Sequence, residues 1–380
     1  MGPASYSEAR FTYLDRCARD SCAKIRDLFE EWFGRYPEKE RADFTSRFRS
    51  KNDVHFISSF FELYLHELLL RLGYVVTAHP EMSPDQSKRP DFRGTSPSGD
   101  SLIVEAVLAH DNFDEDFGAM ARKNTTIDSI NQIVNNEFTL SIREKGFPQT
   151  TPSGLRLRVS IEAWLATLDA DACLKLVVEQ RAEELPQMSW EHDGWSVTFV
   201  AWPIHRKDRG RRDRRLVGSQ STEFRAVDSR APLRKAIKRK ATRYGQIGGP
   251  YVVAVNVRSS FLDDIDIAEA LFGEEQHSVF ETEEGEFETL MSRRPDGAWR
   301  GPGGSRNTRV SAVLIVRSLD PWGVTARTPE IFHNPWAAFP CIGPITELTQ
   351  HIPKNGKLIK RRGRPPHEVF QLPISWPFQE

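Results

Sequence analysis

Two acidic residues in the first third of the chain have the types and positions of a metal site. Glu105 interrupts an otherwise apolar stretch, residues 101 to 109, that has the composition of a buried β-strand. Because side chains alternate along a strand, Glu105 shares a face with Ile103 and Val107, where a lone carboxylate is costly to bury unless a cation meets it. Asp91 opens the preceding predicted strand and can lie beside Glu105. Two neighbouring carboxylates attract a hard divalent cation such as Mg²⁺.

Glu62 supplies a third acid. Residues 53 to 72 have a helical pattern that is apolar around most of its circumference, so this helix is expected to be buried. Glu62 lies in its narrow polar stripe together with Ser58, Ser59 and His66. The sequence therefore predicts that Glu62, Asp91 and Glu105 converge on one acidic site.

The three acids need a defined order of elements to bring them together. The sequence predicts a helix, three strands, a helix and a fourth strand, at residues 53 to 72, 74 to 79, 91 to 95, 101 to 109, 115 to 135 and 138 to 142. Asp53 is expected to cap the first helix and Gly73 to end it. Turn residues at 97 to 100 predict a hairpin between the second and third strands.

The regions on either side of this core have their own patterns. Residues 1 to 52 are expected to form a helical N-terminal extension, and residues 146 to 380 an α+β region that extends the core sheet and binds substrate. In the latter region we predict helices at 153 to 168, 170 to 183 and 232 to 245, a hairpin at 188 to 203, and strands at 250 to 257 and 309 to 317.

Residues 53 to 145 resemble the PD-(D/E)xK nuclease superfamily. The resemblance is carried by Pro90-Asp91, by Glu105-Ala106-Val107, by Glu62 on the preceding helix, and by the order of elements. It implies a restriction-endonuclease-like core, a mixed sheet flanked by helices. It also implies that Asp91 and Glu105 hold Mg²⁺ or Mn²⁺, with Glu62 adding a metal contact or orienting water, and that the reaction is hydrolysis of a phosphodiester bond.

The chain departs from the family pattern at one position, because Val107 stands where the family has a lysine that helps to activate water. Either the chain is catalytically inactive or a lysine comes from elsewhere. Lys123 lies in the centre of the apolar stripe of the helix at 115 to 135, and a lysine that faces a core needs a carboxylate partner. The sheet face of Glu105 is the expected place for that partner. Lys240 is the second candidate, on the apolar face of the helix at 232 to 245.

Three stretches are rich in lysine and arginine, at residues 205 to 215, 234 to 243 and 354 to 364. Phosphate backbones attract such clusters through the release of counterions. The cations expected to contact nucleic acid are Lys240, Arg211, Arg212, Arg362 and Arg364. Arg362-Gly363-Arg364-Pro365 also resembles the core of an AT-hook, which lies in the minor groove of DNA. The alternative for each stretch is a solvated loop or helix face.

The composition of the 380 residues adds few constraints. The net charge of -1 favours no class of partner, and none of the four cysteines forms a C-x-x-C pair, so a structural zinc site has no support. The sequence has no apolar run of membrane-spanning length and no visible signal peptide, which predicts a cytoplasmic protein. We expect a Mg²⁺-dependent nuclease that acts on DNA, with a homodimer or a partner subunit as the candidate assemblies. The resemblance suggests a bacterial restriction or defence role.

Two rival interpretations remain. The first is a catalytically inactive module that keeps the nuclease-like fold and binds nucleic acid or a protein. The second is an unrelated α/β scaffold in which Asp91 and Glu105 point apart and bind no metal.

Overall fold

A computed structural model describes residues 4–82, 88–110, 117–210, 215–222, 230–245, 247–258, 262–281, 287–354 and 357–378. The chain divides into two compact units. Unit 1 comprises Met1–Glu8 and Asp114–Val227, and unit 2 comprises Ala9–Phe113 and Asp228–Glu380. The predicted core at residues 53 to 145 does not coincide with either unit, because the boundary at Phe113 and Asp114 divides it.

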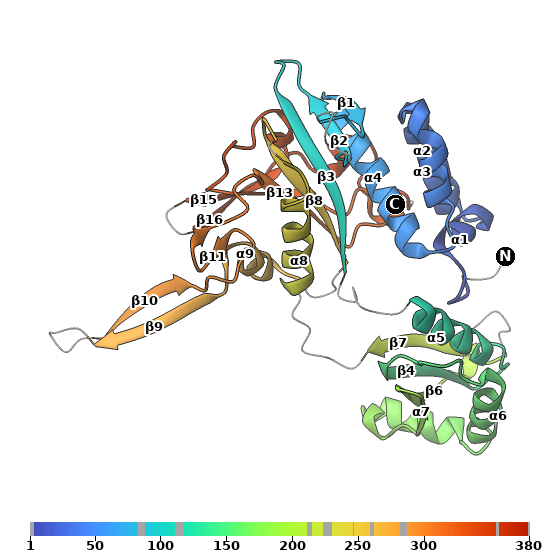
Figure 1. Cartoon of the computed structure of the whole chain (residues 1–380). Coiled ribbons are helices and arrows are strands. Elements are labelled where there is room, and N and C mark those ends of the chain that lie inside the picture. The colour runs from blue at the N-terminus through green and yellow to red at the C-terminus, as the bar shows by residue number, and fades with distance from the viewer. Residues whose placement is uncertain are drawn as a thin grey trace. The chain divides into compact units, whose positions relative to one another are not determined.

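Unit 2 is built around an eight-stranded mixed sheet with the order β1-β2-β3-β8-β13-β14-β15-β16 (Figure 1). Its strands are β1 (Val75–Ala78), β2 (Phe92–Thr95), β3 (Ser101–His110), β8 (Tyr251–Arg258), β13 (Ala312–Arg317), β14 (Glu330–His333), β15 (Thr349–Lys354) and β16 (Lys357–Arg361). Strands β1, β2 and β3 pair antiparallel, and β3, β8 and β13 pair parallel. The predicted hairpin of β2 and β3 is confirmed, with Thr95 opposite Ser101.

Helices cover both faces of this sheet. One face packs on α1 (Arg10–Arg16), α2 (Asp20–Arg35), α3 (Arg41–Phe48), α4 (Asp53–Arg71) and α10 (Pro366–Phe370). The other packs on α8 (Arg230–Ala241) and α9 (Asp264–Phe272). Strand β8 is buried over seven consecutive residues because both of its faces meet a helical layer. The expected α/β class, a mixed sheet flanked by helices, is therefore confirmed.

Helix α4 has nearly the bounds that its apolar pattern predicts. The cap differs from the prediction: the Asn52 side chain accepts a hydrogen bond from the Val54 backbone, and Asp53 is the first helical residue. The Asp53 carboxylate instead accepts a hydrogen bond from the Arg10 backbone. Gly73 ends the helical segment with φ 87°, a left-handed conformation that favours glycine.

The second helix and fourth strand of the predicted core are formed, but not in the core sheet. Helix α5 (Phe117–Ile130) and strand β4 (Phe138–Gly146) belong to unit 1. In unit 2, α8 and then β8 follow β3, and β8 lies directly beside β3 in parallel. The sequence analysis assigned the next helix and strand along the chain to the core sheet. In the structure, more than a hundred residues separate β3 from its parallel neighbour β8.

Unit 1 has a four-stranded sheet with the order β5-β6-β4-β7. The other three strands are β5 (Gln187–His192), β6 (Trp195–Pro203) and β7 (Val217–Thr222), and the other helices are α6 (Gly154–Leu165) and α7 (Ala170–Val178). Asp193 and Gly194 both have positive φ in the tight turn between β5 and β6, as the predicted hairpin requires. The helices and one sheet face enclose a core that is separate from those of unit 2.

Smaller elements complete the described chain. They are the ladder of β9 (Glu275–Glu281) with β10 (Phe287–Arg293), the short pair β11 (Arg300–Gly301) and β12 (Gly304–Ser305), and 3-10 turns at Glu38–Glu40, Ala182–Glu184, Arg206–Asp208, Pro321–Gly323 and Pro344–Glu347. Of the helices in the described ranges, none combines the length and apolarity needed to cross a membrane.

Because the two units have separate cores, we expect two thermal transitions in calorimetry. Ile161 in unit 1 and Ile315 in unit 2 are 0% and 1% exposed. Replacing either with alanine should cost about 2–5 kcal/mol. Ile161→Ala should lower one transition temperature and Ile315→Ala the other. A single transition that both variants shift equally would contradict this division.

Candidate functional site

Glu105 lies in the middle of β3 on the face that α8 covers. Its neighbours on that face, Ile103 and Val107, pack with Leu233 and Ile237 of α8 in one buried cluster. The predicted alternation of β3 is therefore confirmed. Glu105 itself is 1% exposed, so its carboxylate depends on α8 and the following turn for polar partners.

Lys240 and Tyr244 provide those partners. The Lys240 ammonium lies 2.5 Å from Glu105 Oε1, and the Tyr244 hydroxyl donates to Glu105 Oε2 at 2.6 Å. The Arg243 guanidinium is 3.3 Å from Oε1. Lys240 is buried because it occupies the inner, apolar face of α8 beside Ala236. The second of the two candidate lysines is thus the one that meets Glu105.

Asp91 lies beside Glu105, as the pairing of β2 with β3 predicts. Asp91 Oδ2 accepts a hydrogen bond from the Ala106 backbone at 2.6 Å, and the Asp91 backbone donates to Glu105 Oε2 at 3.3 Å. Burial, and then the negative charges of Glu105 and Glu62, raise the pKa of Asp91 to about 7. Asp91 is therefore the acid of this group whose charge is least compensated.

Glu62, on the inner side of α4, has strong partners from the N-terminal helices. The Arg47 guanidinium contacts its two oxygens at 2.7 and 3.2 Å, and the Tyr36 hydroxyl donates to Oε1 at 2.5 Å. His79 Nε2 lies 3.6 Å from the same oxygen. Burial alone would raise the pKa of Glu62, but hydrogen bonds from His79 and Arg47 lower it to about 2.

His79 has a backbone conformation that is uncommon for residues other than glycine. Its φ is 45°, in the left-handed region, and its backbone N–H donates to the Asp91 carbonyl at 2.9 Å. The sequence predicted a surface or structural role for His79 and placed Tyr244 on the apolar face of its helix. It gave no site role to Tyr36 or Arg47. Only His79 carried a usable signal, since it directly follows β1 and precedes a proline.

Among the described residues, Asp91 is the acid of this group with an oxygen open to a cation. Both oxygens of Glu62 and both oxygens of Glu105 have the partners given above. Within the described part of the chain, Asp91 Oδ1 has no hydrogen-bond or ion-pair partner. An acid with a raised pKa and an open oxygen ligand gains from a hard cation, which favours the charged carboxylate.

Lys123 has its carboxylate partner within unit 1. Its ammonium group lies 2.7 Å from Glu144 Oε1, and both residues belong to unit 1. The expectation that a buried lysine on this helix needs a carboxylate is confirmed. The expectation that the sheet face of Glu105 supplies it is wrong, because α5 packs on the sheet that contains β4 and Glu144.

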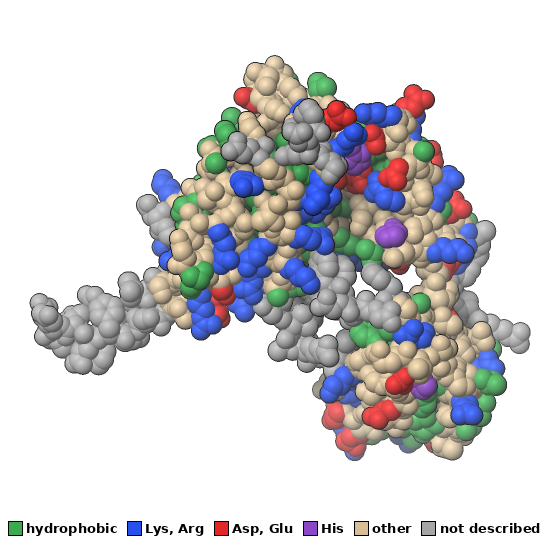
Figure 2. Space-filling model, in the orientation of Figure 1, with side chains coloured by type: hydrophobic (Ala, Val, Ile, Leu, Met, Phe, Trp, Pro, Cys, Tyr) green, Lys and Arg blue, Asp and Glu red, His purple; other side chains and the backbone are tan. Residues whose placement is uncertain are grey.

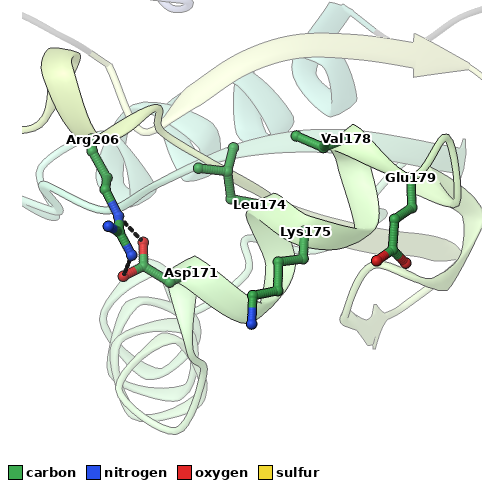
Figure 3. A pocket seen from close by; sticks show the side chains of 6 residues that line it. All are labelled: Asp171, Leu174, Lys175, Val178, Glu179 and Arg206. Carbon is green, nitrogen blue, oxygen red and sulfur yellow. Dashed lines mark hydrogen bonds and ion pairs between the residues drawn. The ribbon is translucent and has the colours of Figure 1, made fainter.

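The predicted nucleic-acid contacts have varied surroundings. Lys and Arg side chains gather over α8 on the face of unit 2 seen in Figure 2. Arg211 and Arg212 lie outside the described residues. In the same basic stretch, Arg206 and Arg209 both pair with Asp171, at 2.6 and 2.7 Å, beside a shallow pocket of unit 1 (Figure 3).

The Arg-Gly-Arg segment that resembles an AT-hook is attached to the body of unit 2. The Arg364 backbone donates to the Glu347 carbonyl, and its guanidinium pairs with the Glu347 carboxylate at 2.8 Å. A Cβ at Gly363 would approach the Glu347 carbonyl oxygen to 2.2 Å. Arg362 is exposed. In this conformation the segment is not free to lie along a minor groove.

A second cluster of possible metal ligands occurs at Asp264, Glu330 and His351, whose ligand atoms lie within 4.8 Å of one another. Lys360 lies 2.7 Å from Glu330 Oε1, and Arg317 pairs with both carboxylates. Burial would raise the pKa of Glu330, but His351 and these two cations lower it to about 2. The two acids are thus already balanced by two side-chain cations, which makes this cluster the poorer metal site.

Comparison of the chain with protein-family models, with curated proteins and with solved structures found no match.

Replacing Asp91 and Glu62 with their amides should change stability in opposite directions at pH 8. The raised pKa of Asp91 means that stability from its neutral form is present below about pH 4 and is lost as the pH rises to about 7. The lowered pKa of Glu62 means that stability from its charged form is present above about pH 4 and is lost as the pH falls towards 2.

Asp91→Asn should therefore raise the unfolding temperature of unit 2 at pH 8, with a smaller gain at pH 5, and Glu62→Gln should lower it at both. Thermal unfolding at the two pH values measures this. Destabilisation of unit 2 by Asp91→Asn at pH 8 would contradict the electrostatics described here.

Proposed function

We propose that unit 2 is a metal-dependent nuclease of restriction-endonuclease-like type that hydrolyses phosphodiester bonds, with DNA as the expected substrate and restriction or defence as the expected role. One observation carries the proposal: a lysine ammonium lies 2.5 Å from Glu105, beside Asp91, although Val107 occupies the usual lysine position. The sequence of elements supports it as well. Helix α4, the three antiparallel strands, α8 and β8 have the order that the resemblance implies, with unit 1 inserted before α8.

Asp91 and Glu105 are the residues that would hold Mg²⁺ or Mn²⁺, which would lower the pKa of bound water and stabilise charge on the phosphate oxygens. Lys240 takes the role of the family lysine. Its charge, fixed in a buried position, favours the negative charge that develops on phosphorus-bound oxygens. Tyr244 fixes Glu105 through one oxygen, so that the carboxylate cannot rotate away from Asp91.

Glu62 acts mainly as a positioning residue in this proposal. Its two oxygens are engaged by Arg47, Tyr36 and His79, so it connects the N-terminal helices to the acid group. Its charge also raises the pKa of Asp91, which strengthens the preference of Asp91 for a cation.

A catalytically inactive module that binds nucleic acid is the second candidate. It is favoured by the contacts of Glu105, whose oxygens already have an ammonium and a hydroxyl partner. A metal would have to share or displace those partners. Cleavage assays distinguish the two candidates directly.

Lys240→Met should abolish Mg²⁺- or Mn²⁺-dependent cleavage of plasmid and single-stranded DNA, whereas Lys123→Met should leave it unchanged. The two lysines form a matched pair, since they are 7% and 8% exposed and each contacts one glutamate. Lys123→Met leaves the buried Glu144 without its cation and should destabilise unit 1 by about 3–5 kcal/mol. Lys240→Met leaves Glu105 with Arg243 and Tyr244, so it should destabilise unit 2 by less. Assays are therefore made well below the transition temperatures.

Asp91→Asn provides the complementary variant, because it should remove cleavage while making unit 2 more stable at pH 8. Loss of cleavage in Asp91→Asn and Lys240→Met, with activity in Lys123→Met, supports the nuclease. Wild-type protein that cleaves no substrate with either metal would favour the binding module. Cleavage that persists in Asp91→Asn would exclude this site.

A further inference from the structure

Helix α8 has two distinct faces. Its inner face is buried and contains Leu233, Ala236, Ile237, Lys240 and Ala241. Its outer face contains Lys235 and Arg239, which are exposed, and Arg243 continues the same row just beyond the helix. Lys235 and Arg239 are four residues apart, so they lie one above the other on the helix, about 6 Å apart along its axis. Arg243 follows in the turn after α8.

The row ends at the acidic site. The Arg243 side chain is 39% exposed, and its guanidinium lies 3.3 Å from Glu105 Oε1. The next residue, Tyr244, donates to the other oxygen of the same carboxylate. Arg243 therefore belongs to the row of cations and also contacts Glu105.

The surroundings of the row are also rich in positive charge. The pKa of Lys238, between Lys235 and Arg239 on the same helix, is lowered first by partial burial and then by the nearby charges of Arg306 and Arg234, while Asp296 raises it. Arg306 and Arg234 thus add positive charge beside the row, which Asp296 offsets in part. Lys and Arg side chains are gathered over this part of unit 2 in Figure 2.

We propose that Lys235, Arg239 and Arg243 form a track for the phosphate backbone of a nucleic acid, which leads the strand along α8 to Asp91 and Glu105. A row of cations with a spacing of about 6 Å suits successive phosphates of one strand. Arg243 contacts the phosphate nearest the acids, because a planar guanidinium can bind two phosphate oxygens at once. The inference rests on the proposed function for the reaction at the end of the track, but binding to the track requires no cleavage.

The test compares two triple variants by fluorescence anisotropy, with a short labelled DNA duplex and its single strand, in EDTA. The track variant is Lys235→Ala, Arg239→Ala and Arg243→Ala. The control variant is Arg19→Ala, Lys39→Ala and Arg49→Ala. It removes the same charge from exposed positions at the start of α2, in the turn between α2 and α3 and at the end of α3, on the opposite face of the sheet.

Each lost phosphate contact should reduce the slope of log affinity against log salt by about 0.7–0.9, so the track variant should lose about 2–3 in slope. We expect its affinity to fall by about tenfold or more at about 50 mM salt, with the control close to wild type. Calorimetry checks that the track variant is folded. We expect it to fold because its three altered side chains are exposed.

Equal affinity and slope in wild type and track variant would overturn the proposal, as would an equal loss in the control or the absence of DNA binding by wild type at low salt. The outcome is separate from that of the proposed function. Tight binding that the track variant loses, without cleavage by wild type, would retain the track and exclude the nuclease. Cleavage by wild type, together with DNA binding that the track variant leaves unchanged, would support the nuclease and exclude the track.

Discussion

The ammonium group of Lys240 and the carboxylate of Glu105 lie against each other between a helix and a sheet, and both are shielded from water. A carboxylate in the centre of a buried strand is stable only with such a partner. That requirement places α8 over β3 and fixes the rotation of the helix, because Lys240 must point inward. The same rotation turns Lys235 and Arg239 outward. The ion pair thus helps to determine which face of α8 is buried against the sheet and which face is exposed.

The N-terminal helices solve the same problem for Glu62 by different means. Arg47 and Tyr36 reach its carboxylate from α3 and from the end of α2, so a buried charge connects the extension to α4. Asp91 differs from both glutamates. Among the described residues it receives a backbone hydrogen bond but no side-chain cation at hydrogen-bond distance, and its pKa is raised where that of Glu62 is lowered. The fold thus compensates two acids and leaves the third under electrostatic strain, as is common at functional sites.

Local pattern was sufficient to predict much of this arrangement from the sequence. The helix at 53 to 72, the hairpin at 91 to 109 and the inward position of Glu105 follow from periodicity and turn residues, and each is confirmed. The partner of β3 could not be found in this way, because α5 and α8 have equally good patterns and each carries an inward lysine. Only the three-dimensional pairing of β3 with β8 distinguishes them. The contacts of Tyr36, Arg47 and Tyr244 likewise join distant segments whose composition is ordinary.

The insertion of unit 1 between β3 and α8 also affects the order in which the parts of unit 2 are synthesised. Glu105 and Lys240 are 135 residues apart in the chain, and all of Asp114–Val227 is synthesised between them. A ribosome makes the acids early and the lysine late, at about 5–20 residues per second. During those seconds the nascent chain has Asp91 and Glu105 without their cation. The ion pair can therefore form only after the inserted unit and α8 have been synthesised, so the core that Glu105 shares with α8 is completed late in translation.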